Sequence, residues 1–202
     1  MSRKGRTRSE RHLDREVWLK RYEKERRRNL LAGPGAHELV VVLDHLKAGF
    51  NIPKIFRSAE AFGVRELHLV GIAPFDPAPA KGAFKKVPTR EHNDFEVCCR
   101  ELEERGYTLF VLEPDAPETL IEAALPERSA FVFGHEEMGL SFDPGDYPSV
   151  RKLSIPQWGA VESLNVSVAA SIVMYEYVRR WGIEAVRVVG GGGEGRVRHP
   201  RH

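Results

Sequence analysis

The sequence predicts an α/β fold in which a parallel sheet is covered by helices on both faces. Apolar runs typical of buried strands alternate with stretches of helical periodicity between residues 39 and 181. Strands that are buried on both faces read as continuous apolar runs, which is what these segments show. The length of 202 residues and the 42% hydrophobic content suit one domain of ordinary size with extra segments at its ends.

Each expected element is bounded by glycines, prolines or polar residues. Strands are expected at residues 39–43, 66–70, 107–112, 130–133 and 151–155. Helices are expected at residues 52–62, 93–105, 117–125 and 163–181, with a basic, weakly amphipathic helix at 8–28. Residues 72–90 are rich in Pro and Ala and are expected to form a long loop.

This pattern divides the chain into three parts. Residues 1–36 are expected to be a basic helical extension with a linker, residues 37–185 the folded domain, and residues 186–202 a flexible Gly-rich basic tail.

Charge is distributed unevenly along the chain. Residues 1–28 hold 12 Lys or Arg and 5 Asp or Glu, a net charge of +7, and residues 186–202 hold 4 Arg and 1 Glu. Residues 29–185 hold 15 basic and 23 acidic residues, a net charge of −8. Basic segments at the ends of an acidic domain are typical of proteins that bind polyanions, so nucleic acid is the expected partner. The alternative is that these segments only keep the protein soluble.

Membrane, secreted and metal-binding classes are not expected. The sequence lacks a run of about 18 apolar residues and an apolar segment near its N-terminus, so we expect a cytoplasmic protein without a membrane span. Cys98 and Cys99 are adjacent and no CxxC pair exists, which argues against a disulfide and a zinc site. A zinc-protease motif starting at His135 and Glu136 would need a histidine where Gly139 stands.

A first candidate segment runs from Asn51 to Gly63. Asn51 is expected to cap a helix, and Arg57 lies six residues later on an otherwise apolar face of that helix. Ligands of parallel sheets bind beyond the carboxyl ends of the strands, where an Arg can hold a phosphate or carboxylate. The alternative is that Arg57 pairs with Glu60 on the surface.

Two further candidate segments lie in the second half of the chain. Gly134, Glu136 and Gly139 follow an expected strand with the spacing G-x-E-x-x-G, which favours a tight loop. Residues 155–171 form the third segment, in which Ser163 is a natural helix cap and small residues follow it. Free amides at this helix start are able to hold an anion.

The three segments, in this order, resemble the SpoU or TrmH family of RNA 2′-O-ribose methyltransferases over about residues 38–181. The residues that match the family motifs are Asn51, Arg57, Phe62 and Gly63, then Gly134, Glu136 and Gly139, then Ile155, Pro156, Gly159, Ser163, Leu164, Asn165, Val166 and Ser167. Gln157 stands where the family usually has Met.

The resemblance implies a fold, an activity and partners. It implies the SPOUT fold with an α/β-knot, a deep trefoil knot expected within about residues 130–181, and a homodimer. It implies S-adenosylmethionine as the cofactor and methylation of a ribose 2′-hydroxyl in RNA. We expect tRNA rather than rRNA, because the separate folded N-terminal domain of many ribosomal members is not seen. The alternative is a non-catalytic RNA-binding or ribosome-assembly protein on the same fold.

The resemblance also implies roles for single residues. The cofactor is expected near Leu112, Gly134, Ile155, Gln157 and Leu164. Arg57 is expected either to take the hydroxyl proton or to stabilise the developing alkoxide. Three further sets of roles are implied: Asn51 orients Arg57 and the ribose, Glu136 holds Arg57 or shapes the cofactor loop, and Ser163 and Asn165 order the knot and polarise the site.

If the substrate is RNA, the basic segments are expected to bind it. Arg26, Arg27, Arg28, Lys85 and Lys86 are expected to contact RNA phosphates, which the acidic domain would otherwise repel. Removal of residues 1–28 is expected to weaken RNA binding and its salt dependence while sparing cofactor binding.

Overall fold

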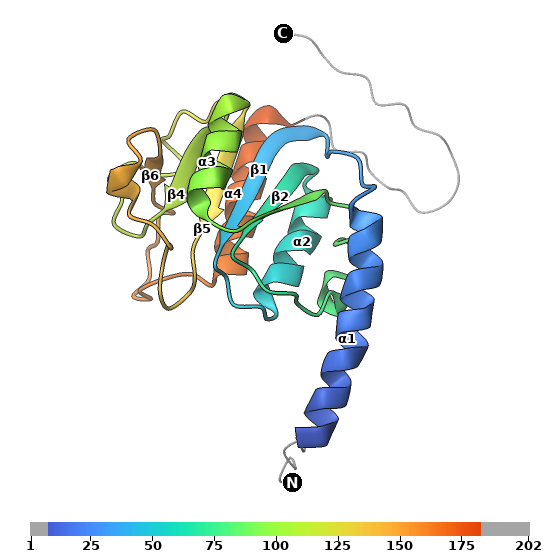
Figure 1. Cartoon of the computed structure of the whole chain (residues 1–202). Coiled ribbons are helices and arrows are strands. Elements are labelled where there is room, and N and C mark those ends of the chain that lie inside the picture. Colours follow the sequence, from blue (N-terminus) through green and yellow to red (C-terminus); the bar gives the residue numbers. More distant parts are fainter. Residues whose placement is uncertain (1–7, 183–202) are drawn as a thin grey trace, which may run out of the picture.

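The computed structural model describes residues 8–182, so the tail expected at 186–202 lies outside the described residues. Within residues 8–182, six parallel strands form one sheet in the order β3-β2-β1-β5-β4-β6 (Figure 1). No helix in this part of the chain is long and apolar enough to cross a membrane.

The elements lie close to the expected positions, apart from the differences given below. The strands are β1 (His37–Asp44), β2 (Val64–Val70), β3 (Thr89–His92), β4 (Thr108–Leu112), β5 (Ser129–Phe133) and β6 (Arg151–Leu153). The helices are α1 (Arg8–Asn29), α2 (Asn51–Ala61), α3 (Phe95–Glu104) and α4 (Val166–Trp181), with short 3₁₀ helices η1 (Ala78–Ala80) and η2 (Pro144–Asp146).

The central strand β1 separates two hydrophobic cores. Leu39, Val41 and Leu43 pack with residues of α2 and α4 on one face of the sheet. Val40 and Val42 point to the other face and pack with residues of α3. Both faces of β1 are therefore buried, which explains its continuous apolar run and confirms the expected parallel sheet with flanking helices.

Helix α1 is attached to the domain by its C-terminal half and extends beyond the sheet (Figure 1). Tyr22 packs against the rings of Phe75 and Phe84, with centroids 5.4 and 5.3 Å away. Asn29 is buried, and its amide donates to the carbonyls of Phe84 at 2.5 Å and Val87 at 2.6 Å. The expected helix is confirmed, while the three-part division of the chain stays a prediction.

Two expectations about local structure are wrong. Residues 117–125 do not form a helix, because Ser154 donates to the carbonyl of Glu118 at 2.9 Å and accepts from the amide of Leu120 at 2.8 Å. These tertiary hydrogen bonds pair Thr119 with Ser154 beside the end of β6, and residues 120–122 form a turn instead of a helix. Residues 72–90 are not all loop, since β3 begins at Thr89. This edge strand has one neighbour and four mostly polar residues, so it lacks the apolar run of a buried strand.

The expected helix caps also differ from the observed ones. Asn51 is the first residue of α2 and does not cap it; Phe50 precedes the helix and makes no side-chain cap hydrogen bond. Ser163 does not cap α4. Asn165 does, because its Oδ1 accepts from the amide of Ser167 at 3.0 Å. The helix therefore begins three residues later than expected.

Candidate active site

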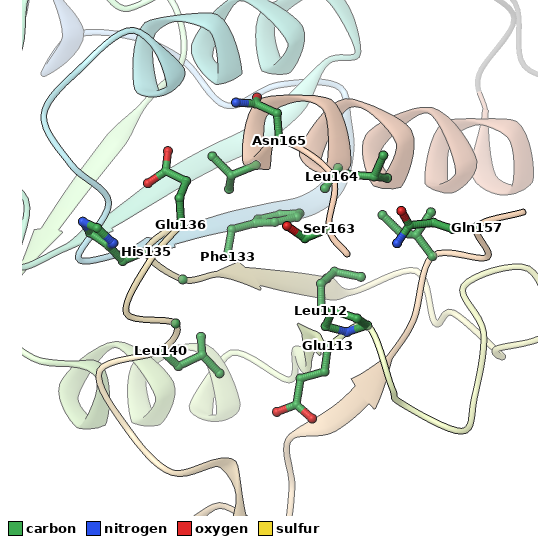
Figure 2. A pocket seen from close by; sticks show the side chains of 16 residues that line it. Leu112, Glu113, Phe133, His135, Glu136, Leu140, Gln157, Ser163, Leu164 and Asn165 are labelled. Carbon is green, nitrogen blue, oxygen red and sulfur yellow. The ribbon is translucent and has the colours of Figure 1, made fainter. Parts of the chain in front are cut away.

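A cavity of about 500 Å³ opens at the carboxyl ends of β4, β5 and β6, beside the start of α4 (Figure 2). Segments that follow these three strands supply its walls, together with residues 163–166 and Ala169. This volume is typical of small-molecule sites, and the position is where ligands of parallel sheets bind.

All five residues expected to hold the cofactor line this cavity. They are Leu112, Gly134, Ile155, Gln157 and Leu164. Of the residues expected to act in catalysis, Glu136, Ser163 and Asn165 also line it. Figure 2 shows Glu136 and Asn165 on one side of the cavity and Gln157 on the opposite side. The fold thus brings these distant residues together around one cavity as expected, while their roles in binding stay predictions.

A tight hairpin forms the wall that follows β5. The amide of His135 donates to the carbonyl of Gly139 at 2.7 Å, and the amide of Gly139 donates back at 2.9 Å. A Cβ atom at Gly134 would lie 2.6 Å from the carbonyl carbon of Gly139 and 2.8 Å from the amide nitrogen of Leu140. Gly139 has a φ of +73°, which disfavours other residues. Both glycines of this motif are therefore required by the backbone geometry.

Asp44 anchors this hairpin, and the sequence analysis missed it. It is fully buried at the end of β1, where its carboxylate accepts from the amide of Ser141 at 2.6 Å and from the Ser141 hydroxyl at 2.8 Å. His45 Nδ1 lies 2.9 Å from the same carboxylate. A buried carboxylate is stable only when it is paired in this way. The sequence signal that could have identified Asp44 is an acidic residue directly after an apolar run.

Side chains from the three motifs meet at the edge of the cavity. Asn51 Nδ2 donates to the carboxylate of Glu136, and Asn51 Oδ1 accepts from Asn165 Nδ2 at 3.3 Å. Asn165 Oδ1 in turn accepts from the Ser167 hydroxyl at 2.6 Å. One hydrogen-bonded chain therefore connects α2, the hairpin after β5 and the start of α4. We call Glu136, Asn51 and Asn165 the polar chain.

Arg57 lies on the exposed side of α2 and is not part of the cavity wall. Within residues 8–182 its guanidinium forms no hydrogen bond or ion pair, so neither Asn51 nor Glu136 holds it here. The surface pair with Glu60 is not formed either, because Glu60 binds Lys86 at 2.7 Å.

Helix α2 is fixed against α4 by a hydrogen bond between the hydroxyls of Ser58 and Ser171, 2.8 Å apart.

The five residues expected to contact RNA differ in their surroundings. Arg26 is held by Glu91 at 2.8 Å and by Asn29 Oδ1 at 2.7 Å, so it fastens α1 to the domain. Arg27 and Arg28 are exposed near the end of α1. Lys86 is exposed but paired with Glu60, and Lys85 is half-buried. Of the five, Arg27 and Arg28 are the most accessible to a polyanion.

Comparison with known proteins gives consistent matches. The model of the SpoU rRNA Methylase family matches residues 38–175. A 23S rRNA (guanosine-2′-O-)-methyltransferase RlmB from Nitrosomonas europaea is 34% identical over 157 residues, which cover 75% of this chain and 60% of the relative. A tRNA (guanosine(18)-2′-O)-methyltransferase from Thermus thermophilus is 34% identical over 149 residues, covering 71% of this chain and 75% of the relative.

Among solved structures, the fold is similar to that of the SpoU methyltransferase AviRb from Streptomyces viridochromogenes in complex with the cofactor AdoMet. The TM-score is 0.66 at 24% identity, over 76% of this chain and 61% of that one. The chain thus spans about 60% of the length of the Nitrosomonas relative and of AviRb.

Proposed function

Because the chain belongs to the SpoU rRNA Methylase family, we propose that it transfers a methyl group from S-adenosylmethionine to a ribose 2′-hydroxyl of RNA. The observation that carries this proposal is the polar chain beside the cavity, in which Glu136 and Asn165 are joined through Asn51. Residues from three distant segments are placed there with their polar groups turned to one another. A non-catalytic RNA-binding protein on this fold is the alternative, and nothing in its function would require this arrangement.

S-adenosylmethionine fits the cavity in size and chemistry. The volume of about 500 Å³ suits a ligand of this size. Leu112, Phe133 and Leu164 supply apolar walls for a flat base, and Gln157 and Glu113 supply polar groups at the edge. When bound, the cofactor would supply a sulfonium methyl group to the ribose oxygen, leaving a neutral thioether, and the hydroxyl proton would pass to water.

We infer that Arg57 acts as an electrostatic stabiliser rather than as a base. A guanidinium stays protonated in proteins, so it is a poor acceptor for the hydroxyl proton. It is well suited to bind the phosphate beside the target ribose and to stabilise a developing alkoxide. Its lack of a partner within residues 8–182 leaves this charge available, while Asn51 at the start of the same helix belongs to the polar chain.

The RNA is proposed to follow helix α1 towards this site. A second cavity of about 520 Å³ lies between α1 and the loop that precedes α2, and Trp18, Arg21 and Phe50 are among the residues that line it. Phe50 is 74% exposed and directly precedes Asn51. Aromatic rings and guanidinium groups are the side chains on which unstacked bases pack.

Because α1 packs against the domain, its role in RNA binding is better tested by substitutions than by deletion. Removal of residues 1–28 would strip Tyr22 from the core, so it would disturb the fold as well as RNA binding. Replacing both Arg27 and Arg28 by Gln removes two exposed charges and leaves this packing intact. We expect weaker RNA binding and a salt dependence reduced by about two phosphate contacts. An unchanged salt dependence would refute a phosphate-binding role.

A second copy of the chain is the proposed protein partner. Val168, Ile172 and Tyr175 form an apolar stripe on α4, with exposed fractions of 47%, 36% and 60%. The stripe lies on the helix that Asn165 caps, so a partner bound to it would lie close to the polar chain. An Ile172→Glu variant should sediment as a monomer while the parent chain sediments as a dimer. A monomeric parent chain at the same concentration would overturn this proposal.

A deep trefoil knot within residues 130–181 is also part of the proposal. The chain leaves the sheet edge at β6, passes Glu118 and Leu120, and returns to the centre, where α4 packs against β1. A knot would require this returning segment to pass through the loop formed by an earlier part of the chain. An experimental electron-density map traced through residues 112–181 tests this directly.

A reducing, cytoplasmic location is proposed on the state of the two cysteines. Cys98 and Cys99 are buried and free. Free cysteines are typical of compartments that keep thiols reduced. Fractionation of cells that express a tagged chain tests the location, and recovery outside the cytoplasm would contradict it.

We propose tRNA ahead of rRNA as the substrate, although the relatives include enzymes named for both. The test is incubation with radiolabelled S-adenosylmethionine and separated tRNA and rRNA pools. Label in tRNA supports the full proposal, and label only in rRNA overturns the RNA class but not the reaction. If neither pool is labelled while the cofactor binds, the non-catalytic alternative is favoured.

A further inference from the structure

A second cluster of reactive side chains lies outside the cavity and is not used by the proposed reaction. His68 in β2, His92 at the end of β3 and Cys98 in α3 turn one nitrogen or sulfur atom each towards a common point. These three atoms all lie within 4.8 Å of one another. His68 and Cys98 are fully buried, and His92 is half-buried. Imidazole and thiolate groups together are ligands that zinc prefers.

The distances within the cluster are close to those of a zinc site. His68 Nδ1 lies 3.0 Å from His92 Nε2 and 3.4 Å from Cys98 Sγ. With Zn–N bonds of about 2.0–2.1 Å and a Zn–S bond of about 2.3 Å, tetrahedral geometry places the nitrogens about 3.3 Å apart and nitrogen and sulfur about 3.6 Å apart. Two of the three ligand pairs are therefore within a few tenths of an ångström of zinc geometry, and the third pair, His92 Nε2 and Cys98 Sγ, lies within 4.8 Å.

Glu66 prepares His68 to act as a ligand. Its carboxylate lies 3.2 Å from His68 Nε2 and accepts hydrogen bonds only, so Nε2 carries the proton and Nδ1 keeps its lone pair. A carboxylate behind a ligating histidine is a common second layer of metal sites. Arg90 and Arg105 also bind Glu66, and both contact Glu101, so two positive and two negative charges balance beside the cluster.

The side chains of His92 and Cys98 converge on a single nitrogen atom of His68. Neutral His68 has one lone pair on Nδ1, but both His92 and Cys98 approach this atom. The hydrogen bond between the two histidines occupies this lone pair, and the sulfur of Cys98 lies beside the same nitrogen. A cation at the common point would satisfy both histidine nitrogens and the sulfur, which would bind as a thiolate after loss of its proton.

We propose that His68, His92 and Cys98 bind one zinc ion, with a water molecule as the fourth ligand on the side where His92 reaches solvent. The ion would cross-link β2, β3 and α3, three elements that are otherwise joined at the edge of the sheet. The proposal departs from the expectation of a metal-free protein, which rested on closely spaced sequence motifs. Its three ligands are spread over 31 residues, and only the fold brings them together.

The test uses the full chain stripped of metal and a matched pair of cysteine variants. Cys98→Ser removes a ligand, whereas Cys99→Ser changes the neighbouring buried cysteine that lies outside the cluster. Zn²⁺ affinity is measured by competition with a coloured chelator, and Co²⁺ is added as a spectroscopic probe. We expect a thiolate-to-cobalt charge-transfer band in the parent chain and in Cys99→Ser, and its loss in Cys98→Ser with at least a tenfold weaker Zn²⁺ affinity.

A further variant keeps the test decisive if Cys98→Ser does not fold. His92→Gln changes a half-buried ligand at the edge of the cluster and should also lower Zn²⁺ affinity at least tenfold. Weak binding at other histidines is common to all variants and cancels in the comparison. The proposal is overturned if the parent chain gives no charge-transfer band, or if Cys98→Ser and His92→Gln both bind Zn²⁺ as tightly as the parent chain.

Discussion

The hairpin after β5 offers a sharp test of the candidate site, because a methyl group added at Gly134 would clash with the backbone. The new Cβ atom would lie 2.6 Å from the carbonyl carbon and oxygen of Gly139 and 2.8 Å from the amide nitrogen of Leu140. These are backbone atoms, so no side-chain rotation relieves the clash. Overpacking of this kind typically costs about 1–3 kcal/mol.

We expect this clash to weaken the affinity for the cofactor. Gly134, Gly139 and Leu140 all line the cavity, so the backbone shift that relieves the clash moves its wall. If the whole cost falls on the bound state, Gly134→Ala weakens the affinity for S-adenosylmethionine by about 5- to 150-fold. Isothermal titration calorimetry measures this affinity, and denaturant unfolding measures the part that falls on stability.

Gly159→Ala is the matched control, since a Cβ atom there meets no atom within 4 Å. Its free energy of unfolding should stay within about 0.5 kcal/mol of the parent value. The reasoning fails if Gly134→Ala has parent-like stability and cofactor affinity, because the hairpin would then have room that the structure does not show.

Three further predictions concern other parts of the structure. Asp44→Ala should lower the free energy of unfolding by about 1–3 kcal/mol, because it removes the buried carboxylate that accepts two hydrogen bonds from Ser141; an unchanged denaturant midpoint would contradict this. Asn51→Asp should reduce methylation by tenfold or more with little loss of stability, since a carboxylate would then face the carboxylate of Glu136; parent-like turnover would rule out a role for the polar chain. The hydrogen bond from Arg179 lowers the pKa of Glu176 to about 2, so its stabilising effect is present above about pH 4.5 and is lost as the pH falls towards 2. The difference in unfolding free energy between the parent chain and Glu176→Gln should therefore shrink over this range, and a constant difference would contradict the ion pair.

Much of the fold could be predicted because buried strands leave a clear trace in sequence. The central strands β1 and β5 contain the continuous apolar runs Leu39–Leu43 and Ala130–Phe133, since both of their faces are covered. The edge strand β3 has no such trace, and it was missed. Residues 117–125 have helical periodicity, but hydrogen bonds to Ser154 outweigh it. Local patterns do not report contacts between residues that are distant in the chain.

The candidate site was predicted in part for the same reason. The spacing G-x-E-x-x-G singled out Glu136 and the family resemblance singled out Asn165, but the link through Asn51 depends on how three segments meet. Asp44 was missed because its partner Ser141 lies 97 residues away. The cluster around His68 was missed because no short motif contains it.

The most direct test of the account is the identity of the methylated atom, with and without Arg57. RNA labelled by the parent chain and by Arg57→Ala is digested to nucleosides, after calorimetry has shown that both proteins bind S-adenosylmethionine equally. The account predicts label in 2′-O-methylnucleosides from the parent chain and a loss of at least a hundredfold in the variant. Label on a base, or equal labelling by the variant, would contradict it.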